Sequence, residues 1–184
     1  MAAGTLTPWQ RTAHAMLLTA LTFVVACVPL AASGCDEEVE GRFRVKICKE
    51  TYQLEVAATP DKRLKGLGDR ERIDPDGGMV FVFTDLDHDV KEFVMRDCLT
   101  DIDILYVDDS GRVVKWHEMK IETPRGEGET DLDYERRLRR YSSVFPVRIA
   151  IELAPGSIGK LKTQGLREGL KIDCDLDRLK ALAE

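Results

Sequence analysis

Apolar and polar residues alternate from about Phe43 onward, in the segment "FRVKICKETYQLEVAAT". Such alternation is typical of strands with one buried face, and here it predicts two strands that meet at Lys49 and Glu50. The same reasoning predicts strands at "MVFVF", "EFVMR", "IDILYVD", "VVKWHEM", "FPVRIAIEL" and finally "REGLKIDCDL". Gly111, in the "DDSGR" loop, suits a hairpin turn between two of them.

The sequence predicts helices only in short segments. In "TPDKRLKGLGDR", Thr59 suits an N-cap, Pro60 the first helical position, and Gly66 the exit. A polar, charged excursion spans residues 120–140, and its last part, from Asp131, predicts one helix with acidic residues first and basic residues last. A third short helix is expected in "APGSIGKLKTQGL". Together these elements predict an α+β fold: one compact β-rich domain with a curved antiparallel or mixed sheet, barrel-like, and two or three short helices.

The first residues of the chain differ from the rest. Arg11 is the only charged residue before Asp36, and an apolar core from Ala15 to Val28 is followed by Pro29 and small residues. This pattern is typical of a secretory signal peptide. The protein is therefore expected to be exported.

The end of that segment, "AASGC" at residues 31–35, resembles the lipobox of bacterial lipoproteins. The resemblance implies a signal peptide at 1–34, lipidation of Cys35, a tether at 35–42 and a folded domain at 43–184. It also implies an anchor in the bacterial membrane that faces the periplasm or the cell exterior. A plain cleaved signal and an uncleaved anchor remain open, since residues 15–34 carry no charge and are just long enough to span a bilayer.

Net charge argues against one class of partner. Without Arg11 the formal charge falls from −6 to about −7, and no basic stripe with interleaved aromatic residues is present. Nucleic acid is therefore not an expected partner, because binding it requires neutralising many phosphates.

Cysteine spacing leaves two readings. Cys48 and Cys174 lie before and after the main pattern, so a disulfide between them would join the two ends of an exported domain. Alternatively Cys48, Cys98 and Cys174 are free thiols, with Cys98 packed as a small apolar side chain. Without C-x-x-C spacing, no metal site and no cofactor are expected.

The order of several short motifs resembles domain-of-unknown-function family 192. The motifs are T-P-x-x-R-x-x-G-L, G-M-x-F-x-F, F-x-M-R-D with a following I-D-I, D-x-x-G-x-V-V, Y-x-S-x-x-P and E-L-x-x-G. They comprise Thr59, Pro60, Arg63, Gly66 and Leu67; Gly78, Met79, Phe81 and Phe83; Phe93, Met95, Arg96, Asp97, Ile102, Asp103 and Ile104; Asp108, Gly111, Val113 and Val114; Tyr141, Ser143 and Pro146; Glu152, Leu153 and Gly156. The resemblance runs from about Tyr52 to Asp173 and implies a compact β-rich domain with no established activity. Val94, Gly68 and Asp101 depart from the family's usual residues.

Isolated polar residues offer little chemistry of their own. His117 and Glu118 would point to opposite faces of a strand, and "DLDHD" at 85–89, which includes His88, lacks the distant glutamate of a calcium loop. No serine or cysteine has a nucleophile motif. The catalytic residues, if any, are unknown.

Two functions from different classes remain. A non-catalytic binding or accessory module, for a small ligand, a wall polymer or an envelope protein, predicts an apolar groove with Phe93, Trp116 and Tyr141 near Arg96. A hydrolase of an envelope glycan instead predicts that two of three carboxylates face each other across a cleft. These are Asp101, Asp103 and Glu152.

Asp103 also has a structural reading. It shares a strand face with Leu105 and Val107, so it should be buried and need a cationic or multi-donor partner. Arg96 or Arg70 is the first candidate, and Arg148 the next. Asp97 and Asp101 are expected to hold the bend in "DCLTD".

Overall fold

The computed structural model describes residues 41–84 and 89–183 of the chain. Both ranges belong to one compact unit, Asp36–Glu184. The expected signal peptide, lipidated Cys35, most of the tether and His88 lie outside the described residues. Within these ranges, no helix has the length and apolar character needed to cross a membrane.

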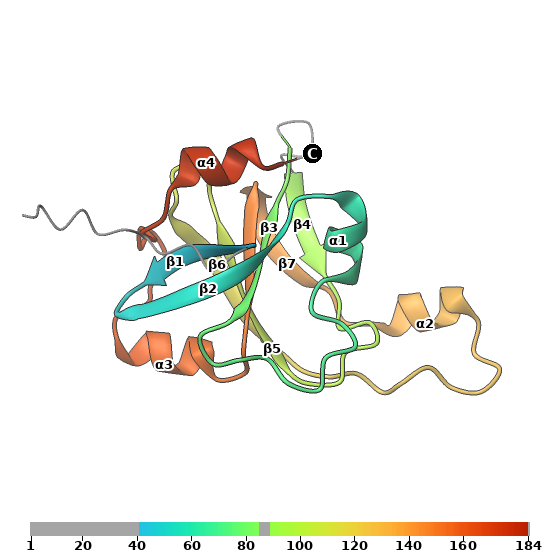
Figure 1. Ribbon diagram of the computed structural model, residues 1–184. Helices are drawn as coiled ribbons and strands as arrows, with labels where there is room; N and C mark the ends of the chain where they lie inside the picture. Colours follow the sequence, from blue (N-terminus) through green and yellow to red (C-terminus); the bar gives the residue numbers. More distant parts are fainter. Residues whose placement is uncertain (1–40, 85–88, 184) are drawn as a thin grey trace, which may run out of the picture. The chain divides into compact units, whose positions relative to one another are not determined.

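Strands dominate the described part of the chain (Figure 1). They are β1 (Arg42–Ile47), β2 (Glu50–Ala57), β3 (Gly78–Val82), β4 (Asp89–Phe93), β5 (Ile102–Val107), β6 (Val113–Met119), β7 (Tyr141–Val147) and β8 (Ile149–Leu153). Six of them form one mixed sheet in the order β1-β2-β3-β8-β5-β6, and β4 pairs with β7 in a separate ribbon. Only β2 and β3 pair in parallel; the other pairs are antiparallel.

The fold class predicted from the sequence is confirmed as compact α+β with a mixed sheet. The sheet is not closed, because β1 and β6 are its two edges. "FPVRIAIEL" contributes to two strands rather than one, since β7 ends at Val147 and β8 begins at Ile149. Barrel closure, which would have paired the edge strands, is absent from the described residues.

The described residues contain four helices rather than two or three. They are α1 (Pro60–Lys65), α2 (Asp131–Arg137), α3 (Ser157–Thr163) and α4 (Leu176–Ala181). As predicted, α1 begins after Thr59, whose side chain accepts a hydrogen bond from the Lys62 N–H.

The predicted last strand, "REGLKIDCDL", is wrong. This segment makes only isolated bridges, Lys46 with Asp173 and Arg112 with Lys171, before α4 begins. Its apolar residues pack against the core from a loop. The alternation of apolar and polar residues there therefore reflects which side chains are buried, and no continuous set of strand hydrogen bonds accompanies it.

Two hydrophobic clusters cover the two faces of the sheet, and β5 contributes to both. Leu105 and Val107 belong to the first cluster, whereas Ile102, Ile104 and Tyr106 belong to the second. A strand buried on both faces reads as a continuous apolar run, which explains "IDILYV". The second cluster packs beside the pocket described below.

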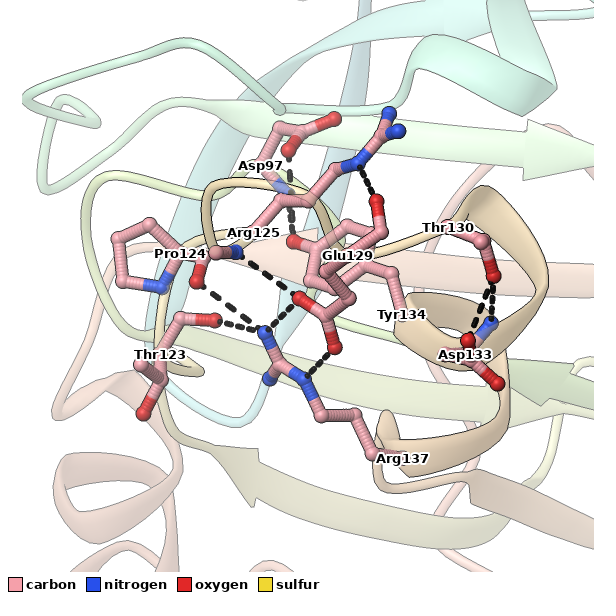
Figure 2. Close-up of polar contacts among 10 residues, drawn as sticks. Asp97, Thr123, Pro124, Arg125, Glu129, Thr130, Asp133, Tyr134 and Arg137 are labelled. Atoms are coloured by element: carbon pink, nitrogen blue, oxygen red, sulfur yellow. Dashed lines mark hydrogen bonds and ion pairs between the residues drawn. The ribbon is translucent and has the colours of Figure 1, made fainter.

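Residues 120–140 form the expected exposed excursion, and α2 lies at its outer end (Figure 1). Glu129 organises it, because its carboxylate accepts from Arg137 Nε at 2.6 Å (Figure 2). The same carboxylate accepts from the Gly126 N–H at 2.9 Å. Arg137 also donates to the carbonyls of Thr123 and Pro124. Hydrogen bonds from Arg137 lower the pKa of Glu129 to about 2. The excursion therefore has its own polar framework.

Candidate functional site

A pocket of about 460 Å³ lies beside α1, at the second face of the sheet. Its walls come from α1 and the loop after it, the end of β3, strand β4 with the segment that follows as far as Ile102 at the start of β5, and one residue of β8. The lining residues are Arg63, Leu64, Lys65, Gly66, Leu67, Gly68, Asp69, Phe81, Phe83, Lys91, Glu92, Phe93, Val94, Arg96, Asp97, Cys98, Ile102 and Glu152. The pocket thus joins four segments that are distant in sequence.

Glu152 is the buried acid of this pocket. It lies in the middle of the sheet, paired with Met79 on β3 and Ile104 on β5, and only 5% of its surface is exposed. Its Oε2 accepts one long hydrogen bond, 3.3 Å, from the Leu67 N–H. Among the described residues, Oε1 has no hydrogen-bond partner. Burial raises the pKa of Glu152 to about 7, against the lowering effects of the Leu67 N–H and Arg70.

Gly66 brings the loop after α1 close to this carboxyl group. Its φ is +54°, and a Cβ at this position would lie 3.3 Å from Glu152 Oε2 and 3.3 Å from Phe81 Cζ. A side chain would push the Leu67 N–H away from the acid. The "KGL" turn is therefore needed for the contact with Glu152.

Aromatic rings form the apolar wall. Phe81 and Phe93 meet edge to face with centroids 4.9 Å apart, and Phe93 continues to Tyr106 at 5.8 Å. Lys91 Nζ lies 4.4 Å from the centroid of the Phe83 ring, and the Arg63 guanidinium lies 5.6 Å from it on this side of the pocket. Ring packing gives the pocket a rigid apolar surface.

Three of the four basic residues that line the pocket have partners within the protein. Arg63 donates to the backbone carbonyls of Ala58 and Val82, and Lys91 pairs with Asp89. Arg96 forms a two-point ion pair with Glu135 of α2, in which Nη2 lies 2.7 Å from Oε2. The positive charge at the rim is thus largely committed to the protein itself.

Cys98 also lines the pocket. Burial, followed by the nearby Glu152 charge, raises the pKa of this thiol to about 12. A thiol with such a pKa is almost entirely protonated at neutral pH, so Cys98 is not poised as a nucleophile.

Seven residues were candidates for a ligand site or a structural polar site, and of these the pocket brings together Arg96 and Glu152. The seven are Arg70, Arg96, Asp101, Asp103, Trp116, Tyr141 and Glu152. Arg70 pairs with Glu55 through two contacts, of 2.7 and 2.8 Å, and lines a smaller neighbouring cavity of about 300 Å³. Asp101 accepts from Lys120 Nζ at 2.7 Å and from the Ile121 N–H at 3.0 Å, so it holds the start of the excursion.

Trp116 and Tyr141, expected to line the same groove, do not line the pocket. Trp116 packs against the first cluster, and Tyr141 is a buried member of the second. The Tyr141 carbonyl accepts from Tyr106 OH at 2.6 Å, which makes Tyr141 part of the core. The predicted groove therefore retains Phe93 and Arg96 but not these two rings.

Asp103 is buried, with 2% exposure, as expected, but the partners suggested from sequence are wrong. Its Oδ2 accepts from the Ile158 N–H at 2.7 Å, in the first turn of α3. Arg96 and Arg70 are held by glutamates elsewhere, and Arg148 donates to the Phe83 carbonyl. The buried aspartate therefore anchors a helix and not an arginine.

The strand register separates the carboxylates proposed for hydrolysis. Asp103 pairs with Leu153, and Ile104 pairs with Glu152. Since paired residues share a face and neighbours alternate, Asp103 and Glu152 point to opposite faces of the sheet. The geometry required for a pair of catalytic carboxylates is not formed by these residues.

Of the two alternatives from the sequence, this structure has the second: Cys48, Cys98 and Cys174 are free thiols, and no bridge joins Cys48 to Cys174. Cys48 and Cys174 instead pack, partly buried, against the first cluster. Burial raises the pKa of Cys174 to about 11. No cluster of His, Cys, Asp and Glu within residues 41–84 and 89–183 has the arrangement of a metal site.

Sequence reasoning overlooked most of the pocket. Cys98, Lys91 and Val94 were not proposed as site residues. Six others were noted as motif positions, with Gly66 also expected at a helix exit and Asp97 at a bend: Arg63, Gly66, Leu67, Phe81, Phe83 and Asp97. These motif positions, with Phe93, Arg96 and Glu152, come from four separate motif fragments and all line one cavity. The occurrence of these residues in four motif fragments of one family is the sequence signal that could have located the site.

Two solved structures have the same fold. One is a protein named as a proposed transcription regulator from Sinorhizobium meliloti 1021, with a TM-score of 0.55 and 23% identity, covering 72% of this chain and 92% of that chain. The other is a protein of unknown function from Novosphingobium aromaticivorans DSM 12444, with a TM-score of 0.55 and 22% identity, covering 72% of this chain and 83% of that chain. At these identities the likeness concerns the fold alone.

A comparison with curated proteins found no match. The model of family DUF192, described as "Uncharacterized ACR", matches residues 43–173. This range is most of the chain and contains every residue that lines the pocket. The protein belongs to the DUF192 family.

Proposed function

We propose that this protein is a non-catalytic module of the bacterial envelope, tethered by lipid at Cys35, that binds a small ligand in the pocket beside α1. The tether follows from the lipobox-like "AASGC". The binding function rests on the pocket and its chemistry.

One observation carries the binding proposal. A buried carboxyl group with an unpartnered oxygen, Glu152 Oε1, lines a cavity of about 460 Å³ that also has aromatic walls. Small-molecule sites are commonly cavities of roughly 300–1,000 Å³ with apolar linings and a few polar groups that fix orientation. Glu152 Oε1 is not among the fully buried atoms that lack a partner, so it is reachable from the cavity, where a ligand that donates a hydrogen bond can replace water.

The experiment is to identify what the protein carries in its own host. Full-length protein would be extracted from host membranes in mild detergent and examined by native mass spectrometry. The expected result is a protein species with additional mass from a small molecule. Protein without any bound small molecule would contradict the binding proposal.

Two matched variants test whether the pocket holds that molecule. Val94→Trp places a large ring in the pocket lining, whereas Val90→Trp makes the same change at an exposed position of β4 outside it. The ligand mass should disappear from Val94→Trp and persist in Val90→Trp, with both variants folded by circular dichroism. A ligand retained by Val94→Trp would place binding elsewhere.

A further inference from the structure

The basic residues of the pocket and its buried acid differ in how many partners they have within the protein. Arg63, Lys91 and Arg96 each have a carbonyl or carboxylate partner, whereas Glu152 has one long hydrogen bond and an oxygen without a partner. Lys65, the remaining basic residue of the lining, is exposed to solvent, so the buried group still available for a ligand is the acid. A ligand that satisfies Glu152 must bring a hydrogen-bond donor.

Two further features favour a positively charged donor. Asp69 and Asp97 are exposed at the rim, and their charges act, with that of Glu152, on the Cys98 thiol, so three acids lie on the same side of the pocket. Phe81 and Phe93 form the wall there, and aromatic rings attract cations and the apolar stems that carry them.

We propose that the pocket binds a ligand through a primary ammonium group, which pairs with Glu152 while an apolar portion packs against Phe81 and Phe93. This inference rests on the proposed function, since it names the ligand class of the same pocket. On binding, Glu152 is ionised: at pH values below about 7 the carboxyl proton is released to solvent as the ammonium group takes its place.

Matched probes separate the possible ligand chemistries. Phenethylamine, 2-phenylethanol and 3-phenylpropionate share a phenyl ring and differ in carrying an ammonium, a hydroxyl or a carboxylate group. Binding of each to the full-length protein would be measured by isothermal titration calorimetry in one non-ionic detergent. At pH 8 phenethylamine should bind at least about tenfold more tightly than the other two, as expected for a charged hydrogen bond in a buried site.

The variants localise the effect. Glu152→Gln should reduce the preference for the amine to less than about threefold, because the amide is uncharged. Glu71→Gln removes an exposed acid outside the pocket lining and should leave the preference within about threefold of wild type, since exposed charges are screened. Loss of the preference in both variants, or in neither, would overturn the role of Glu152.

The wild-type protein alone provides a second readout if Glu152→Gln fails to fold. Affinity for phenethylamine should fall about tenfold for each pH unit below 7, while affinity for 2-phenylethanol stays constant. The other charged or titratable groups that line the pocket are Arg63, Lys65, Asp69, Lys91, Glu92, Arg96, Asp97 and Cys98. An affinity for the amine that does not change between pH 5 and 8 would contradict the proposal.

The outcome also separates this inference from the proposed function. Tighter binding of 3-phenylpropionate or 2-phenylethanol, or no binding of any probe, overturns the ammonium ligand. The binding function then still stands if host-derived protein carries a ligand that Val94→Trp loses. It fails only if that ligand is absent or is retained.

Discussion

At the scale of single residues, Asp103 and Glu152 are two buried carboxyl groups that the fold treats differently. Asp103 receives a 2.7 Å hydrogen bond from the Ile158 N–H, whereas the Leu67 N–H reaches Glu152 at 3.3 Å. Burial raises the pKa of both. The first group is a structural anchor and the second is poised for a partner.

Asp103→Ala should lower the free energy of unfolding by about 1–3 kcal/mol, because it leaves the buried Ile158 N–H without an acceptor. This is less than the loss expected for breaking a buried ion pair, since no cation is stranded. Asp103→Asn, which retains an acceptor, should lose less. Urea denaturation measures each change. The control Asp101→Ala removes a more exposed pair and should cost less than about 1 kcal/mol; equal losses at both positions would be contrary to this account.

Glu152→Gln should stabilise the protein at alkaline pH. Because the folded pKa of Glu152, about 7, lies above the unfolded value of 4.5, its contribution to stability is present below about pH 4.5 and is lost as pH rises through 7. Wild type should therefore lose about 2–3 kcal/mol relative to the variant between pH 5 and 8, measured by urea denaturation.

Glu55→Gln is the matched control for that pH series. Hydrogen bonds from Arg70 lower the pKa of Glu55, so its contribution is present above the unfolded value of 4.5 and is lost only in acid. Its stability difference from wild type should stay flat between pH 5 and 8. If the stability difference between Glu152→Gln and wild type were also constant between pH 5 and 8, the raised pKa of Glu152 would be refuted.

At the scale of elements, α2 is tied to the rim of the pocket from outside. Arg96 pairs with Glu135, and the Asp97 N–H donates to the Tyr134 hydroxyl group at 3.3 Å. Figure 2 shows Tyr134 and Asp97 in contact beside the polar framework of the excursion. The excursion therefore supports the segment that carries Arg96 and Asp97.

Glu135→Gln should loosen this attachment. The Arg96–Glu135 pair is about one-third exposed, so its loss should cost about 0.5–1 kcal/mol and speed local hydrogen exchange in α2 by about two- to fivefold. Exchange in β5 should not change. Arg136→Gln, at an exposed position of the same helix, is the control. Hydrogen–deuterium exchange that is unaltered in Glu135→Gln would show that the pair does not hold α2.

The sequence was most informative where the cause of structure is local. Thr59 and Pro60 act within one turn, so the start of α1 could be predicted, and the alternation in "IDILYV" correctly placed Asp103 on the face of Leu105. The alternation in "REGLKIDCDL" was misleading, because forming a strand there depends on pairing with distant residues.

Partners across the fold could not be predicted. The donor to Asp103 comes from α3, 55 residues later, and the donor to Glu152 comes from Leu67, 85 residues earlier. Both are backbone N–H groups, which every residue except proline carries, so no residue type marks them in the sequence. The pocket was missed for the same reason, since four distant segments meet only after folding.

At the scale of the whole molecule, the tether proposal concerns residues that precede the described domain. Cys35→Ser should abolish labelling by a fatty-acid analogue and release the protein from membranes, because stable anchoring requires the acyl chains. Cys27→Ser, which changes a cysteine within the expected signal peptide, should keep the label. A Cys35→Ser protein that stays on the membrane with its full leader would instead support a transmembrane anchor.

The central claim is that the pocket beside α1 contains a buried acid that the protein leaves without a full set of partners. The direct measurement is a pH titration of the Glu152 carboxyl carbon by ¹³C nuclear magnetic resonance in glutamate-labelled protein, with Glu152→Gln to assign the signal. The account predicts a midpoint near 7 in ligand-free protein. A midpoint at or below the ordinary value of 4.5 would contradict it, because the carboxylate would then already be stabilised within the fold.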